Sequence, residues 1–349
     1  MNPLSAIDAI SPAWNHTRSL LRSLRLRTLL KIGIVALFTQ AGGCNGNFSS
    51  MRGHHLPGMP PALGPALLFI GLITGFFALI ISLAFFYLNS RLQFVLFEVV
   101  LRRDTVIAPI WRRYGRATWY WMGLKLIFAL VAILCVAPFL ALPVIHIIRS
   151  VSLFSQDATP NPSEVLRFFL TLLPLLVPFL VAAIIAGCFY RLLYSFGLPS
   201  MAMEGTSIGE TYRRVAQLVR VEPGAVLLYI VMSLLLGIVI GIVNLFILLL
   251  VIGIALIPLG GAGLGLWFGL HHAGVAGYVG MGLGFAVLGL IFLAVLFVTV
   301  LVLTAYVYCF WQSYALYFLG GRYPLVGQYL GWPAPPPTGY PPAQPAPAM

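Results

Sequence analysis

The longest uncharged stretch of this sequence runs from Pro223 to Gly321 and contains no Asp, Glu, Lys or Arg. The chain of 349 residues is 60% hydrophobic and only 8% charged, with a mean hydropathy of +0.99. A soluble chain carries about 25% charged residues, so these values indicate an integral membrane protein. Apolar runs of about 20 residues cross a bilayer as helices, whereas barrel strands alternate over about ten. The sequence therefore predicts an all-α, polytopic bundle of membrane-spanning helices.

About six transmembrane helices, arranged as three hairpins, are predicted. Five of them are clear apolar runs: Pro65–Leu88, Leu126–Ile148, Phe168–Tyr190, Ala225–Leu250 and Val279–Phe310. The remaining one, Ile32–Cys44, is the weakest, because it reaches a spanning length only by drawing on Leu26–Leu30. From the sequence it stays open whether Ile32–Cys44 crosses fully, and whether 251–270 is a seventh span or a packed outer loop.

A basic segment recurs in the chain after 101 residues. Ile107-x-x-x-Trp111-Arg112-Arg113 aligns without a gap on Ile208-x-x-x-Tyr212-Arg213-Arg214. An apolar run precedes and follows each copy, so the repeats extend over about 65–117 and 166–222. A basic, half-apolar segment between two spans is typical of an amphipathic helix on the membrane surface. We therefore expect cytoplasmic amphipathic helices in both repeats.

The distribution of Lys and Arg favours one orientation. With a cytoplasmic amino terminus and six spans, 17 of the 20 Lys and Arg lie on the inner side. Only Arg52, Arg149 and Arg167 lie outside, so the positive-inside rule predicts that both termini are cytoplasmic. The net charge of +12 does not indicate a nucleic-acid partner, because the charges cluster beside spans and no recognition module accompanies them.

The chain divides into three regions. Residues 1–31 form a basic amphipathic lead-in, residues 32–325 the transmembrane domain, and residues 326–349 a Pro-rich disordered tail. Eight prolines and no charges occur in Trp332–Met349, which makes the tail an inert spacer or a ligand for the aromatic groove of a protein partner. Ala41–Cys44 could also be a lipoprotein cleavage site. The segment before it is too long for an ordinary signal peptide, so the sequence leaves open whether Cys44 is lipidated.

Arginine pairs are the candidate binding residues. Guanidinium groups offer two parallel donors to a phosphate, and basic residues near the membrane surface attract anionic headgroups. The predicted headgroup-binding residues are Arg102, Arg103, Arg112, Arg113, Arg213 and Arg214. Plain orientation by the positive-inside rule is the equally weighted alternative.

Groups that carry out chemistry are scarce in the predicted spans. An enzyme or a coupled pump working inside the membrane needs an ionisable group there, and only His146 and Lys125 lie at span ends. The sequence contains no HExxH, GxSxG, P-loop or paired intramembrane carboxylates. The pairs His54-His55 and His271-His272 lack the spacing of a recognised metal site. We therefore expect no enzymatic activity, no catalytic residue, no metal and no cofactor.

Several segments carry a family resemblance. They are Phe94–Arg116, Pro199–Pro223, the close at Tyr314–Pro324, the lead-in Trp14-Asn15-His16-Thr17 and the turn Gly42–Phe48. In these segments the chain resembles uncharacterised bacterial polytopic membrane proteins related to the membrane domain of glycerophosphodiester phosphodiesterases. The resemblance implies a bacterial inner membrane and no phosphodiesterase activity, because the metal-binding barrel of those enzymes is absent from the sequence.

Two function hypotheses follow. The leading one is a non-catalytic scaffold or lipid-interacting membrane module, with membrane lipids as partners. The alternative is a small-solute or lipid transporter using the third and fourth spans, which Pro138, Pro143, Pro174 and Pro178 interrupt. The sequence does not determine a substrate, a physiological role or an oligomeric state.

Overall fold

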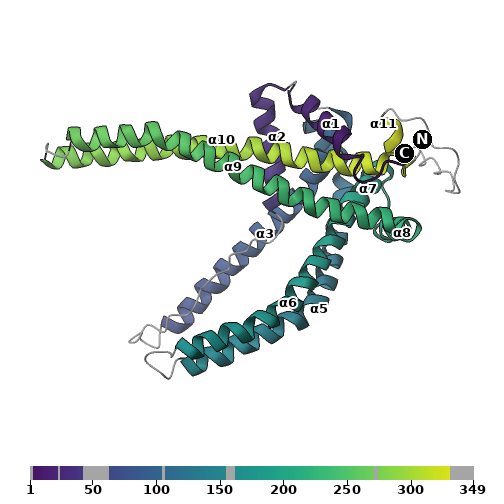
Figure 1. Cartoon of the computed structure of the whole chain (residues 1–349), viewed down its shortest axis with the longest axis horizontal. Helices are drawn as coiled ribbons and strands as arrows, with labels where there is room; N and C mark the ends of the chain where they lie inside the picture. The colour runs from purple at the N-terminus through teal and green to yellow at the C-terminus, as the bar shows by residue number, and fades with distance from the viewer. Residues whose placement is uncertain are drawn as a thin grey trace. The chain divides into compact units, whose positions relative to one another are not determined.

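The computed structural model describes residues 3–22, 24–41, 63–103, 107–154, 162–270 and 274–330. All regular structure in these residues is helical (Figure 1). The elements are α1 (Ile10–Arg22), α2 (Leu26–Ala41), α3 (Leu63–Arg102), α4 (Ile107–Arg113), α5 (Gly115–Phe154), α6 (Pro162–Leu192), the π-helical η1 (Leu193–Gly197), α7 (Leu198–Glu204), α8 (Ile208–Val221), α9 (Pro223–Leu270), α10 (Gly274–Gly320) and α11 (Pro324–Tyr329).

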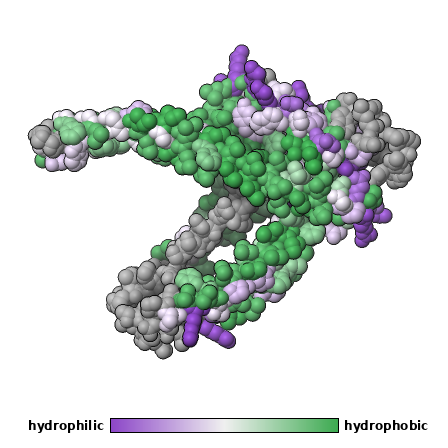
Figure 2. Space-filling model, in the orientation of Figure 1, coloured by the Kyte–Doolittle hydropathy of each residue, from purple (hydrophilic) through white to green (hydrophobic). Residues whose placement is uncertain are grey.

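Five helical segments are long and apolar enough to cross a membrane. They are Phe69–Arg102, Gly115–Arg149, Leu166–Glu204, Pro223–Leu270 and Gly274–Gly320. In the apolar window of each segment, at most 6% of the residues are buried inside the protein. Figure 2 accordingly shows hydrophobic residues over much of the visible surface of α5, α6, α9 and α10. Helices that expose such apolar lengths match lipid rather than water, so they indicate a multi-pass membrane protein.

The structure differs from the sequence-based expectations in the number of spans and in the form of residues 251–270. The described residues hold five candidate spans where six were predicted, because α2 has 16 residues and extends only about 24 Å. A bilayer core is about 30 Å thick, and Gly42–Cys44 lies outside the described residues. Residues 251–270 form neither a separate span nor a loop, because α9 continues through them to Leu270.

Long helices α9 and α10 pack against each other as one hairpin (Figure 1). A Cβ added at Gly263 would lie 3.1 Å from the ring of Phe285, and one added at Gly284 would lie 2.6 Å from Leu266. Glycine therefore permits close approach at both positions. The two helices have 48 and 47 residues, or about 70 Å each, which is more than one crossing needs.

The chain forms two compact units. Unit 1 contains the described residues of Met1–Gly115 and Leu227–Ala343, and unit 2 those of Arg116–Val226. In unit 1 most of the buried residues lie on α1, α2 and α4, on the last turns of α3 and α10, and on the first turns of α9. Tyr229 of α9 stacks on Tyr314 of α10 with ring centroids 5.1 Å apart. The core of unit 1 is therefore at the ends of the long helices and not along them.

Helix α2 is fixed to its neighbours at two points in unit 1. At Gly33 the backbone approaches α10 so closely that an added Cβ would clash with the carbonyl oxygen of Leu301. At the other end, Nδ2 of Asn89 on α3 donates to the carbonyl oxygens of Phe38 (2.8 Å) and Thr39 (2.7 Å). The last carbonyl groups of a helix have no partner within it, so Asn89 satisfies two of them at the end of α2.

Unit 2 is built around the beginning of α5 and the segment from η1 to α8. Trp121 of α5 is fully buried, and its ring lies 6.3 Å from that of Tyr194 in η1. Pro199 has no N–H to donate to the carbonyl four residues earlier, and the widened π turn immediately before it accommodates the missing bond. An added Cβ at Gly197 would lie 3.0 Å from Thr211, so α8 packs closely on η1.

Substitution of Gly33 by alanine tests the contact between α2 and α10. The new methyl group would meet the backbone of Leu301, which cannot rotate away, so Gly33→Ala should destabilise the protein by about 1–3 kcal/mol. The measurement is thermal unfolding of the detergent-solubilised chain. The matched control is Gly71→Ala on α3, where an added Cβ meets nothing within 4 Å. Equal unfolding temperatures for the two variants would contradict this packing.

Candidate functional site: arginines at the ends of the long helices

A buried carboxylate organises the end of α3 in unit 1. The Glu98 side chain is only 5% exposed, and its Oε1 lies 3.2 Å from Nε of Arg102 and 3.2 Å from Nη1 of Arg113. A carboxylate removed from water needs such charged donors, because desolvation of an unpaired charge is costly. Burial and the neighbouring Glu98 carboxylate raise the pKa of the Tyr114 hydroxyl. Glu98 therefore connects α3 with the end of α4.

Arg91 of α3 holds the carboxyl end of α4 from the other side. Its Nε and Nη2 donate to the carbonyl oxygen of Trp111 at 3.1 and 2.6 Å, and Nη1 donates to the hydroxyl of Tyr87. The guanidinium also lies over the Trp111 ring, 4.5 Å from its centroid. A cation at the carboxyl end of a helix is favourable because unsatisfied carbonyl groups gather there. Arg91 thus fixes Trp111, the residue directly before Arg112.

His16 joins α1 to the ends of α3 and α10. Its Nε2 donates to the carbonyl oxygen of Val100 at 2.9 Å, so the neutral ring leaves Nδ1 as an acceptor. Nδ1 lies 3.3 Å from Nη2 of Arg103 and 3.4 Å from the hydroxyl of Tyr317. Burial, and to a smaller extent the charge of Arg103, lowers the pKa of His16. Arg103 itself adopts a left-handed conformation at the end of α3, with φ of 58°.

In unit 2 a second arginine is held by carboxylates. Nη1 of Arg214 lies 2.5 Å from Oε2 of Glu204, the last residue of α7, and Nη2 lies 3.1 Å from Oε1 of Glu210. Glu210 is in the first turn of α8, where Ser207 caps the helix by accepting from its backbone N–H. The start of α8 is therefore fixed to the end of α7 through Arg214.

The six predicted headgroup-binding arginines separate into two groups. Four have intramolecular partners: Arg102 pairs with Glu98 and contacts Tyr329, Arg103 faces His16, Arg113 pairs with Glu98, and Arg214 pairs with Glu204 and Glu210. Arg112 and Arg213 are exposed, and within the described residues neither makes an ion pair. These two occupy the same position in the 101-residue alignment.

Sequence reasoning did not identify the residues that pair with the arginines. Glu98 carried a usable signal, because it is the only acidic residue between Asp8 and Asp104. A single acidic residue among seven nearby basic residues is more consistent with a glutamate in a specific ion pair than with one exposed to solvent. Glu204 carried no comparable signal, since its distance from Arg214 depends on the turn between α7 and α8.

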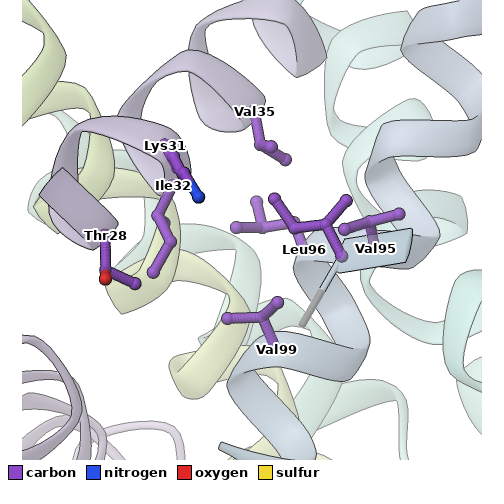
Figure 3. A pocket seen from close by; sticks show the side chains of 8 residues that line it. Thr28, Lys31, Ile32, Val35, Val95, Leu96 and Val99 are labelled. Carbon is purple, nitrogen blue, oxygen red and sulfur yellow. The ribbon is translucent and has the colours of Figure 1, made fainter. Parts of the chain in front are cut away.

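A narrow crevice lies between α2 and α3 (Figure 3). Its lining residues are Thr28, Lys31, Ile32, Val35, Val95, Leu96, Val99 and Ile107. The aliphatic side chains from Ile32 and Val35 on α2 and from Val95, Leu96 and Val99 on α3 are at most 7% exposed. Packing therefore closes this crevice, and it offers no room for a ligand of ordinary size.

The His16 contacts predict a dependence of stability on pH. Because the folded state lowers the pKa of His16 below its usual 6.5, stability is fully present above about pH 6.5 and decreases as the pH falls below it. Urea unfolding of the detergent-solubilised protein between pH 8 and pH 5 measures this. His16→Gln, which keeps a donor for the Val100 carbonyl but cannot titrate, should flatten the profile. An unchanged profile in His16→Gln would assign the pH dependence to other groups.

Comparison with known proteins gives a family for the chain. No curated protein and no solved structure matches the sequence. The model of a family of unknown function, DUF7544, matches residues 4–328. That range includes the five candidate spans and every paired arginine described above. The match shows no link to the glycerophosphodiester phosphodiesterases. The chain belongs to the family of unknown function DUF7544.

Proposed function

We propose that this protein is a non-catalytic, lipid-interacting module of a bacterial inner membrane, with Arg112 and Arg213 as its headgroup-binding residues. The observation that carries the proposal is a difference within the two aligned pairs, Arg112-Arg113 and Arg213-Arg214. In both, the second arginine forms an ion pair with a glutamate, whereas the first is exposed and makes no ion pair within the described residues. An exposed guanidinium is available for the bidentate contact that phosphate oxygens favour.

The aromatic residue before each free arginine supports a position at the membrane surface. Trp111 precedes Arg112, and Tyr212, which is 66% exposed, precedes Arg213. Tryptophan and tyrosine are enriched at the level of the headgroups, because their rings are apolar and their polar atoms remain hydrated. We therefore assign α4 and α8 as the cytoplasmic surface helices of the two repeats.

Contacts in unit 1 support the proposal that both termini lie on the same side of the membrane. Nη1 of Arg322 donates to the carbonyl oxygen of Leu4 at 3.0 Å, and the hydroxyl of Tyr314 donates to that of Ala6 at 3.0 Å. The amino-terminal segment is thus tied to the end of α10. An even number of crossings brings both ends to one side, as six spans require, and the excess of Lys and Arg on that side favours the cytoplasm.

Three finer statements belong to the same proposal. We infer that the protein has no enzymatic activity, because within the candidate spans the exposed side chains are overwhelmingly apolar. We also propose a relationship to the membrane domain of glycerophosphodiester phosphodiesterases, from the resemblance in Phe94–Arg116, Pro199–Pro223 and Tyr314–Pro324. The Pro-rich tail, which lies outside the described residues, stays a predicted ligand for a protein partner.

No feature of the described residues favours a transporter over a lipid-interacting module. α5 remains helical through Pro138 and Pro143, as α6 does through Pro174 and Pro178. A path for a polar solute needs polar groups near the middle of the spans. The exposed arginines of α5 and α6, Arg116, Arg149 and Arg167, lie toward the helix ends, and the large exposed side chains between them are aliphatic and aromatic. Lipid interaction requires no such path, so we prefer it.

Paired substitutions test the headgroup role. Arg112→Gln/Arg213→Gln should weaken retention of anionic lipid by about 2 kcal/mol, or roughly thirtyfold, because each basic residue at the membrane surface contributes about 1 kcal/mol. Native mass spectrometry of the protein released from phosphatidylglycerol-containing nanodiscs measures the retention. Thermal stability should be unchanged, since neither arginine is in an ion pair of the described structure.

Arg113→Gln/Arg214→Gln is the matched control. It removes the same charge but leaves Glu98 and Glu204 short of a partner, so it should destabilise the protein by at least about 1 kcal/mol. Its effect on lipid retention should be smaller than that of the first pair. If both double variants lose lipid equally, the arginines act through total charge alone and the proposed sites are wrong.

Cysteine accessibility tests the orientation. In a background without native cysteines, a membrane-impermeant maleimide added outside should modify a cysteine at Asp157 and miss one at Gly205. Gly205 joins α7 to α8 beside the proposed surface helix, so it should be reached only after the membrane is permeabilised. Labelling of Gly205→Cys from outside intact cells would reverse the proposed topology.

A further inference from the structure

Basic residues on the outward faces of α1 and α2 form a surface that the proposed sites do not include. The residues are Arg18, Arg22, Arg25, Arg27 and Lys31, and all five are exposed. We call this surface the α1–α2 basic face. In Figure 2 hydrophilic residues gather at the upper edge, where Figure 1 places the start of α2. In the described part of the chain none of the five makes an ion pair.

The surrounding sequence leaves the charge of this surface unbalanced. No Asp or Glu occurs between Asp8 and Glu98, and Glu98 is occupied by Arg102 and Arg113. Five cations within 14 residues therefore have no counter-charge from the described part of the chain. Like charges this close repel one another, so an anionic partner would be favoured at this surface.

The opposite faces of both helices are fixed to the protein, so the outward direction is defined. α1 buries Ala13, His16, Thr17, Leu20 and Leu21. α2 buries Leu29, Ile32, Val35 and Ala36, and its Gly33 lies against Leu301 of α10. The four arginines consequently cannot turn inward without breaking this packing, and Lys31, although exposed, also borders the crevice between α2 and α3.

Apolar residues on the same outward faces identify the kind of partner. Trp14 contacts the ring of Phe310 on α10 but remains 51% exposed, and it lies one and two turns before Arg18 and Arg22 on α1. Ile34 is 41% exposed and shares a face with Arg27 and Lys31, at spacings of seven and three residues. Exposed tryptophan and isoleucine beside cations suit the boundary between headgroups and acyl chains, whereas a nucleic-acid surface is more uniformly polar.

The charge pattern of α2 gives the direction of insertion. Its cations lie in the first two turns, and from Ile32 to Ala41 the helix carries no charge. With a length of about 24 Å, the described residues of α2 are shorter than the bilayer core and do not complete a crossing alone. We propose that the α1–α2 basic face binds anionic phospholipids of one leaflet, with the first turns of α2 at the headgroups and its last turns entering the acyl region. This inference rests on the proposed lipid-interacting role and adds a second, separate surface to it.

Depth-dependent fluorescence quenching tests the proposal in the full chain. A fluorophore is attached to Leu26→Cys or Ile34→Cys in a cysteine-free background, both positions being exposed. The proteins are reconstituted in vesicles of phosphatidylcholine alone or with phosphatidylglycerol. Nitroxide lipids should quench Ile34→Cys more than Leu26→Cys, and phosphatidylglycerol should increase quenching at both positions. Iodide quenching that is strong and equal in both vesicles would overturn the proposal.

Charge variants separate this surface from the proposed sites. Replacing all five basic residues by glutamine should remove the response to phosphatidylglycerol, with a loss of binding of more than about tenfold. Arg112→Gln/Arg213→Gln should leave that response intact. If only the second variant removes it, the α1–α2 inference fails while the proposed function stands. Protection of the labels by added RNA, without any lipid effect, would assign the surface to nucleic acid and overturn the inference.

Discussion

Lipid is as apolar as the spans themselves, and this constraint explains where the protein is packed. Two leucine-rich helices gain little hydrophobic free energy by leaving lipid for each other, so burial must come from parts of the chain that would otherwise meet water. The buried residues are accordingly at the ends of the long helices, around Tyr229 and Tyr314 in unit 1 and around Trp121 in unit 2. Close backbone contacts at Gly33 and Gly197 add to this packing.

Ion pairs stabilise the same helix ends. A membrane protein has few charged residues, and a buried charge needs a partner of opposite charge. Glu98 is buried and receives two arginines, and Glu204 receives a third. A carboxylate in each unit thus immobilises the second arginine of a pair, and the adjacent arginine points elsewhere. On a helix, neighbouring residues differ by about 100° in direction, so one member can serve the fold and the other can face the membrane. The proposed lipid role follows from that geometry.

Several features of the fold follow directly from local sequence. Hydropathy over windows of about 20 residues predicts the five candidate membrane-spanning helices of the described residues, since transfer into lipid depends on summed side-chain contributions. α4 and α8 begin at Ile107 and Ile208, the two residues that the 101-residue alignment superimposes. The wider repeat and the sixth crossing stay predictions. α9 extends through 251–270 because that region, although rich in glycine, contains no polar residue that would end a helix in lipid.

By itself the sequence determined the class of protein, the position of the apolar helices and the set of arginines from which binding residues must come. These are properties of composition and spacing along the chain. Tertiary structure alone decided that Arg113 and Arg214 form ion pairs while Arg112 and Arg213 form none within the described residues, and that Asn89 caps the end of α2. The physical reason is distance: an ion pair or a helix cap requires atoms within about 3–4 Å, and packing sets which residues from separate helices come that close.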